Sequence, residues 1–185
     1  KAPEITLSKL TRHGITTVLG LLGTDGISRN VENLLAKAKA LKEEGISCLI
    51  VSGSYQYPPI TITDDIKKDI MFTDEVVGCK LALSDHRSSH VRTKELKRLA
   101  SDIRVSSMLS GKCGILILHM GDEKKALSQV FKIIESTDIP VSLFRPTHVA
   151  RNKQLLEDGF KLLSMGGYID LTAEPQMSAT HAILK

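Results

Sequence analysis

The chain alternates short apolar runs with longer stretches in which apolar residues recur every three to four positions. Short runs rich in Val, Ile and Leu are typical of buried strands, and the periodic stretches are typical of helices with one packed face. Strands are predicted at residues 15–20, 46–51, 76–83, 114–119, 141–144 and 168–171. The alternation predicts repeated βα units and a parallel sheet that is covered by helices.

Helix boundaries are indicated by residues that cap or break helices. The helix after the first strand is predicted to start after Asn30, a favourable N-cap residue, and to end at Gly45. Another is predicted to begin at Asp122 and to end before Pro140. Further helices are expected at residues 7–13, 62–70, 93–109 and 151–164, and an amphipathic pattern starts again at residues 177–185.

Right-handed crossovers leave two architectures open, a doubly wound sheet and a (β/α) barrel. A closed barrel of eight units usually takes about 250 residues, whereas this chain has 185. We therefore expect an α/β fold, a TIM-like (β/α) barrel with about six units, over residues 1–185 as a single domain. Such a barrel is either incomplete or the central part of a longer chain.

Composition excludes several classes of protein. Hydrophobic residues make up 42% and charged residues 25%, which is typical of a globular domain. The formal net charge is only +4, and basic residues are scattered among acidic ones, so no nucleic-acid partner is expected. No apolar run approaches the roughly 20 residues that span a bilayer, so no membrane partner is expected either. Three widely spaced cysteines in apolar runs predict buried, reduced thiols and a cytoplasmic location.

Two histidines fall at the carboxyl ends of predicted strands, the edge where parallel α/β folds place their chemistry. His119 ends one strand and His148 follows the next. Two imidazoles at neighbouring strand ends can share a zinc ion, which lowers the pKa of bound water to about 7 and supports hydrolysis. The alternative is that each histidine only caps a strand or bonds a backbone carbonyl.

Lys80 lies inside an apolar strand, where a charged ammonium is costly and the neutral amine is favoured. A neutral lysine can form a Schiff base with a carbonyl substrate. It can also add carbon dioxide to give a carbamate whose oxygens bridge two metal ions. The alternative is a lysine that is paired with a carboxylate or extends to solvent.

Four further residues could bind an anionic substrate or stabilise the charge that develops on it. Arg87 and Arg151 each offer a guanidinium fork for a carboxylate, and the backbone beside Thr24 offers N–H groups. Tyr55 can donate a hydrogen bond to a developing oxyanion. The alternatives are surface ion pairs for the arginines and simple packing for the tyrosine.

In their order and spacing these features resemble the isoaspartyl (β-aspartyl) dipeptidases of the amidohydrolase superfamily, which are metal-dependent hydrolases with a (β/α) barrel. The resemblance covers nearly the whole chain. It rests on residues 17–29, 35–37, 43–47, 53–55, 84–88, 119–122, 124–126 and 146–152.

The resemblance implies a role for each candidate residue. Lys80 would be carboxylated and would bridge two zinc ions, with His119 and His148 as ligands of one of them. A zinc-bound hydroxide would then cleave the isopeptide bond of a β-aspartyl dipeptide. Tyr55 would be catalytic and would also contact the substrate. The substrate's carboxylates would be held by Thr24, Arg87 and Arg151, and the protein is expected to be a homo-oligomer.

Two parts of the family's catalytic set are expected to lie outside this chain. They are a His-x-His pair, which would precede Lys1, and a last-strand aspartate, which would follow Lys185. Two other functions therefore stay open. One is a non-catalytic module or inactive fragment that binds acidic ligands, and the other is a lyase that uses Lys80 as a Schiff base.

Overall fold

The structure is a computed structural model and describes residues 4–172. The amphipathic pattern predicted at residues 177–185 lies outside the described residues. In chain order the elements are α1 (Leu7–Thr11), β1 (Thr17–Gly20), α2 (Val31–Glu43), β2 (Ser47–Gly53), α3 (Ile66–Phe72), β3 (Val76–Leu83), α4 (Thr93–Ser110), β4 (Ile115–Met120), α5 (Ser128–Ser136), the 3₁₀ turn η1 (Val141–Leu143), β5 (Phe144–Thr147), the 3₁₀ turn η2 (Val149–Arg151) and α6 (Lys153–Ser164).

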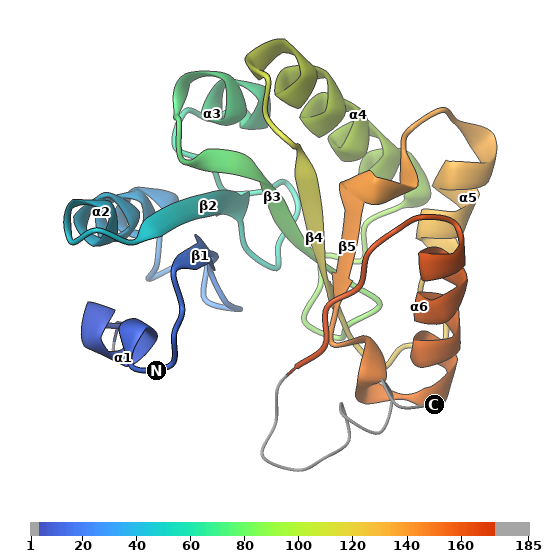
Figure 1. The fold of residues 1–185 in the computed structure, drawn as a ribbon. Coiled ribbons are helices and arrows are strands. Elements are labelled where there is room, and N and C mark those ends of the chain that lie inside the picture. The colour runs from blue at the N-terminus through green and yellow to red at the C-terminus, as the bar shows by residue number, and fades with distance from the viewer. Residues whose placement is uncertain (1–3, 173–185) are drawn as a thin grey trace.

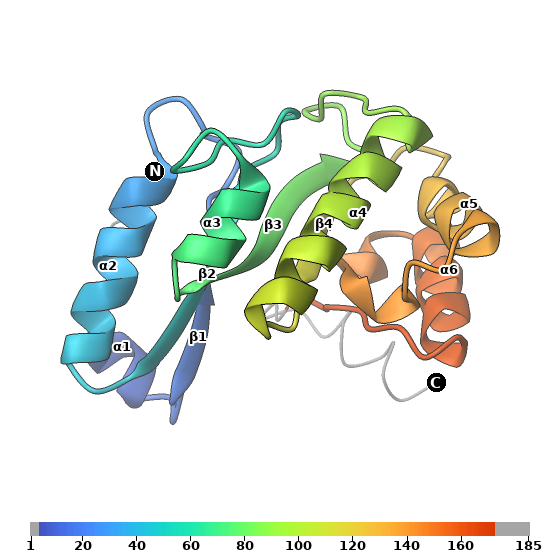
Figure 2. The same cartoon turned by 90° about the horizontal axis from the view of Figure 1, so that it is seen from above.

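The five strands form one parallel sheet in the order β1-β2-β3-β4-β5, so each strand pairs with its neighbour in sequence. The sheet curls, and the helices from α2 to α6 lie along its outer side (Figure 1). The view from above shows α2, α3 and α4 side by side across that face (Figure 2). The predicted α/β, TIM-like architecture is thus confirmed as a half-barrel.

Two of the predicted strands differ from the observed ones. Residues 141–143 form the turn η1 directly after Pro140, and the strand begins only at Phe144, which pairs with Leu116. The predicted sixth strand at residues 168–171 is reduced to one parallel bridge between Thr147 and Asp170. Six units were predicted, and residues 4–172 form five strands.

Helix starts follow local backbone geometry. Asn30 caps α2 by accepting a hydrogen bond from the backbone N–H of Asn33, as predicted. The helix predicted from Asp122 begins only at Ser128, because Ala126 has a φ of 41° and cannot continue a right-handed helix. The helix predicted at residues 62–70 is α3, which starts one residue after its cap, Asp65.

The main core lies between the sheet and the outer helices, and it includes Ile50, Leu81 and Leu118. A smaller apolar cluster on the inner face contains Val51, Val77 and Ile117. Because side chains alternate between the two faces of a strand, the residues next to Leu81 and Leu118 face inward. The strands therefore carry Lys80 and His119 on the inner face of the half-barrel, with Lys80 opposite Ile117.

Two of the three cysteines behave as predicted. Cys48 and Cys79 are buried, whereas Cys113 is exposed, because it follows the end of α4 at a turn instead of belonging to a packed run. All three thiols are free. Within residues 4–172, no helix combines the length and the apolar character that a membrane span requires.

Candidate active site

The structure brings six of the seven predicted site residues to the carboxyl ends of the strands. Lys80 and His119 lie in β3 and β4. Tyr55 and Arg87 lie in the loops after β2 and β3, and His148 and Arg151 lie at the turn η2 after β5. We call these six residues the strand-end cluster.

Lys80 is 4% exposed. Its ammonium nitrogen donates a hydrogen bond of 2.5 Å to the carbonyl oxygen of Leu22 and lies 5.1 Å from the centre of the Tyr55 ring. Burial lowers the pKa of Lys80 to about 8. The side chain does not extend to solvent, and it pairs with no carboxylate among the described residues.

Tyr55 and the two histidines form a chain of ring contacts. The Tyr55 hydroxyl lies 2.8 Å from Nδ1 of His119, and the two ring centres are 4.3 Å apart. The rings of His119 and His148 meet edge to face, with their centres 4.6 Å apart. His148 has a left-handed φ of 67°, which is uncommon for a residue with a side chain, and its Nδ1 contacts the hydroxyl of Thr172.

The surroundings of both imidazoles favour the neutral form. Burial, aided by the charge of His148, lowers the pKa of His119 to about 4. Burial and the charge of Arg151 also lower the pKa of His148. A neutral imidazole has a free lone pair, which is the form that binds metal ions.

Arg87 and Arg151 converge on one buried carboxylate, that of Asp85, which is 1% exposed. Arg87 pairs with it through two side-chain hydrogen bonds of 2.9 and 2.7 Å. Arg151 approaches the same carboxylate to 3.7 Å. The hydrogen bonds from Arg87 hold the pKa of Asp85 well below its usual range. Sequence reasoning gave Asp85 no role of its own, although its position two residues after β3 and two residues before Arg87 was a usable signal.

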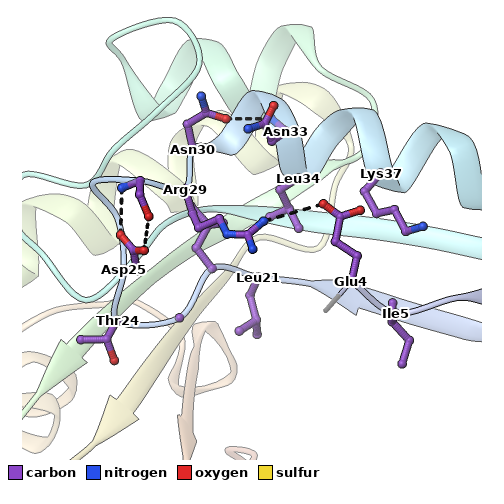
Figure 3. A pocket seen from close by; sticks show the side chains of 13 residues that line it. Glu4, Ile5, Leu21, Thr24, Asp25, Arg29, Asn30, Asn33, Leu34 and Lys37 are labelled. Carbon is purple, nitrogen blue, oxygen red and sulfur yellow. Dashed lines mark hydrogen bonds and ion pairs between the residues drawn. The ribbon is translucent and has the colours of Figure 1, made fainter. Parts of the chain in front are cut away.

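Thr24 lies apart from the cluster. It lines a cavity of about 710 Å³ between the loop after β1 and the start of α2 (Figure 3). Glu4 and Arg29 face each other there, with a nitrogen–oxygen distance of 3.7 Å. No side-chain contact found within residues 4–172 joins Thr24 to the cluster, and the cavity contains none of the six residues. The link is indirect, since Lys80 bonds the carbonyl of Leu22 in the same loop.

The donor set of the cluster can be tested against a metal site. Among the residues that the structure describes, no group of three or more His, Cys, Asp and Glu side chains could hold a metal ion. Two neutral, adjacent imidazoles are suitable ligands, and Lys80 would add anionic oxygens only after carboxylation. The residues present therefore fit part of a metal centre, provided that Lys80 is modified.

Solved structures similar to this chain include two of one enzyme. No family model matches the chain. A β-aspartyl dipeptidase from the thermophilic, keratin-degrading Fervidobacterium islandicum AW-1 is 47% identical over 94% of this chain, with a TM-score of 0.92. Its complex with the β-Asp-Leu dipeptide is 46% identical over 98% of this chain, with a TM-score of 0.95. The present chain covers 48% and 50% of those two chains, so it spans about half of their length.

A more distant structure has the same fold. The phosphotriesterase homology protein from Escherichia coli, solved with phosphate in its active site, is 15% identical over 94% of this chain, with a TM-score of 0.60. The fold is therefore that of a TIM-like (β/α) barrel protein. Within that class, the identity of 46–47% over nearly the whole chain is decisive, and the chain belongs to the β-aspartyl dipeptidase family.

Proposed function

We propose that this chain carries much of the active site of a metal-dependent hydrolase that cleaves the isopeptide bond of β-aspartyl dipeptides. One observation carries the proposal. Within residues 4–172 the Lys80 amine is buried without a carboxylate partner, beside Tyr55, and His119 on the same inner face contacts His148. The similarity to a dipeptidase solved with β-Asp-Leu supports the choice of substrate.

His119, His148 and a carboxylated Lys80 would hold the metal, which we propose to be a pair of zinc ions. When bound, zinc supplies an activated water at neutral pH and polarises the scissile carbonyl. The chain prepares its ligands for this task in two ways. Burial favours the neutral form of both imidazoles, and it lowers the pKa of Lys80 to about 8, so an appreciable fraction of the amine is neutral and able to react with carbon dioxide.

Tyr55 would stabilise the reaction's oxyanion. Its hydroxyl is held at the cluster by the contact with His119, and its backbone carbonyl accepts a hydrogen bond from Ala82 in β3. A donor that is fixed before the reaction needs little reorganisation when charge develops on the substrate oxygen. Tyr55 is only 6% exposed, so water competes weakly for that hydrogen bond.

Arg87 and Arg151 would bind the carboxylates of the dipeptide, with help from the backbone at Thr24. Their side chains are 37% and 29% exposed, so each guanidinium is still accessible to a ligand while it contacts Asp85. A cytoplasmic location and a homo-oligomeric assembly complete the proposal. Two buried free thiols support the former and the family resemblance supports the latter.

The test uses full-length protein prepared without chelators. We expect bound zinc by elemental analysis, an intact mass that includes a lysine carbamate under native conditions, and hydrolysis of β-Asp-Leu but not of α-Asp-Leu. Protein with zinc bound that leaves β-Asp-Leu intact would contradict the proposal. Lys80→Ala should abolish turnover, and short carboxylates should restore part of it by replacing the carbamate.

The second candidate is a non-catalytic module that binds acidic ligands. It is favoured by the incomplete set of metal ligands among the described residues. Metal-free protein that binds acidic dipeptides without cleaving them would support it. A Schiff-base lyase, in contrast, would let borohydride trap a carbonyl substrate on Lys80, which a carbamate would not.

A further inference from the structure

The buried carboxylate of Asp85 is tied to Arg87 by three hydrogen bonds. Arg87 donates to it from Nε at 2.9 Å, from a terminal nitrogen at 2.7 Å and from its backbone N–H at 2.8 Å. The two side-chain bonds form a bidentate pair, the geometry in which a guanidinium is most firmly oriented. The guanidinium of Arg87 is therefore fixed by Asp85.

The same carboxylate also approaches one residue of β4 and one residue of the turn after β5. Its Oδ2 atom lies 3.7 Å from a terminal nitrogen of Arg151, after β5, and 3.3 Å from Nε2 of His119, in β4. Asp85 itself is 1% exposed, so it is shielded from the solvent side where a substrate would arrive. One carboxylate thus contacts both of the arginines assigned to the substrate.

The backbone around Asp85 is held firmly in place. Ser84 has a left-handed φ of 52°, and its hydroxyl donates to the carbonyl of Ala126. The loop after β4 presses against this turn, because a Cβ on Gly121 would lie 2.4 Å from the Cα of Asp85. Glu123 donates its backbone N–H to the carbonyl of Ser84. The position of Asp85 is therefore fixed by the loop after β4 in addition to its bonds with Arg87.

The negative charge of Asp85 has an electrostatic effect on the two arginines that are assigned to the substrate. Two guanidiniums that converge on one small site repel each other and would spread apart in the absence of a counter-charge. A buried anion between them offsets that repulsion and leaves their remaining N–H groups free for a ligand. We propose that Asp85 is a positioning residue that holds Arg87 and Arg151 in place for the two carboxylates of the dipeptide, without touching the substrate.

This inference rests on the proposed function, since it concerns the arginines that bind the proposed substrate. The test compares Asp85→Asn with Asp138→Asn in the full-length protein. Both variants remove one negative charge, and Asp138 is exposed in the loop before β5. We expect Asp85→Asn to raise KM for β-Asp-Leu about tenfold or more, to change kcat less than threefold, and Asp138→Asn to change neither.

A second measurement separates positioning from a general structural role. In an Arg87→Met background, Asp85→Asn should raise KM by much less than it does in the wild-type protein, because its main partner is already gone. A KM that Asp85→Asn leaves unchanged, or effects of the two substitutions that simply multiply, would overturn the inference. If Asp85→Asn does not fold, Asp85→Glu replaces it, because glutamate keeps the charge but moves the carboxylate out of the bidentate pair, and KM should again rise.

Binding of succinate, a dicarboxylate that cannot be hydrolysed, distinguishes the two proposals. Calorimetry should give a dissociation constant at least five times higher for Asp85→Asn than for the wild type. If wild-type protein binds succinate in this way but leaves β-Asp-Leu intact, the proposed function fails and the positioning role stands. Equal affinity in both proteins, or no binding by either, would refute the positioning role.

Discussion

The hydroxyl of Tyr55 lies 2.8 Å from Nδ1 of His119, although the two residues come from different units of the half-barrel. Tyr55 follows β2 and His119 is the last residue but one of β4, so the contact crosses the end of β3. The backbone carbonyl of Tyr55 is itself bonded to Ala82, which pairs with His119 in the sheet. Strand register therefore sets the distance between an oxyanion donor and a candidate metal ligand.

Tyr55→Phe tests whether this hydroxyl acts in the reaction. The substitution removes one donor and little volume, so we expect kcat for β-Asp-Leu to fall about 10²- to 10³-fold, the effect of losing one oxyanion donor. KM should change little. Tyr57→Phe is the matched control, because Tyr57 lies in the same loop but outside the strand-end cluster. Equal rates for Tyr55→Phe and the wild type would show that the hydroxyl is not catalytic.

Lys80 should destabilise the metal-free protein near neutral pH. Burial lowers its pKa from 10.5 to about 8, so between these values the folded state binds fewer protons than the unfolded state. Stability contributed by this group therefore rises with pH from about 8 to 10.5. Lys80→Met removes the buried charge, which stabilises the fold, but it also leaves the carbonyl of Leu22 unpaired, which offsets part of that gain. We therefore expect the free energy of unfolding at pH 7 to rise by about 1–2 kcal/mol.

Urea unfolding of the chelator-treated protein, repeated across this pH range, measures both effects. The wild-type curve should slope upward with pH, and the slope should disappear in Lys80→Met. A variant that is less stable than the wild type at pH 7 would mean that Lys80 is a stabilising residue. Activity of Lys80→Met should be lost in the metal-containing protein in either case.

His119 should make the metal-free protein sensitive to acid. Burial is the main cause that lowers its pKa from 6.5 to about 4, so the unfolded state binds more protons between these values. Stability is therefore lost as pH falls through this window, and the half-buried His148 contributes in the same direction. His119→Gln should flatten the dependence of the unfolding free energy on pH between 6.5 and 4. A dependence that is as steep in His119→Gln as in the wild type would contradict this role.

Asp69 should be needed for the loop that carries Tyr55. Its carboxylate is fully buried and accepts hydrogen bonds from Ser52, from the backbone of Ile62 and from both the backbone and the hydroxyl of Thr63. Asp69→Ala leaves these buried donors unpaired, so we expect a loss of about 3 kcal/mol in the free energy of unfolding. The exposed Asp74 gives the control, and Asp74→Ala should cost less than about 0.5 kcal/mol. A similar loss in both variants would contradict the role of Asp69.

Several features of the fold were predictable from local pattern. The periodicity identified strands β1 to β4 within two residues at each end, because the burial of a strand or a helix face leaves a regular trace in the sequence. It also indicated that Lys80 and His119 lie at a strand interior and a strand end. The predicted start of α5 was wrong, because no pattern in the sequence indicates that Ala126 takes a left-handed φ. The exposure of Cys113 was missed for a similar reason, because one turn removes it from the packed run.

The sequence by itself determined a parallel βα half-barrel and the residue types at its carboxyl edge, because both follow from local periodicity and from the resemblance. The tertiary structure decided which of these residues meet. Asp85 contacts Arg87, Arg151 and His119, from three loops and strands, whereas Thr24 lies beside a separate cavity. These contacts depend on the curl and register of the sheet and on the conformation of its loops, which are properties of the whole packed chain.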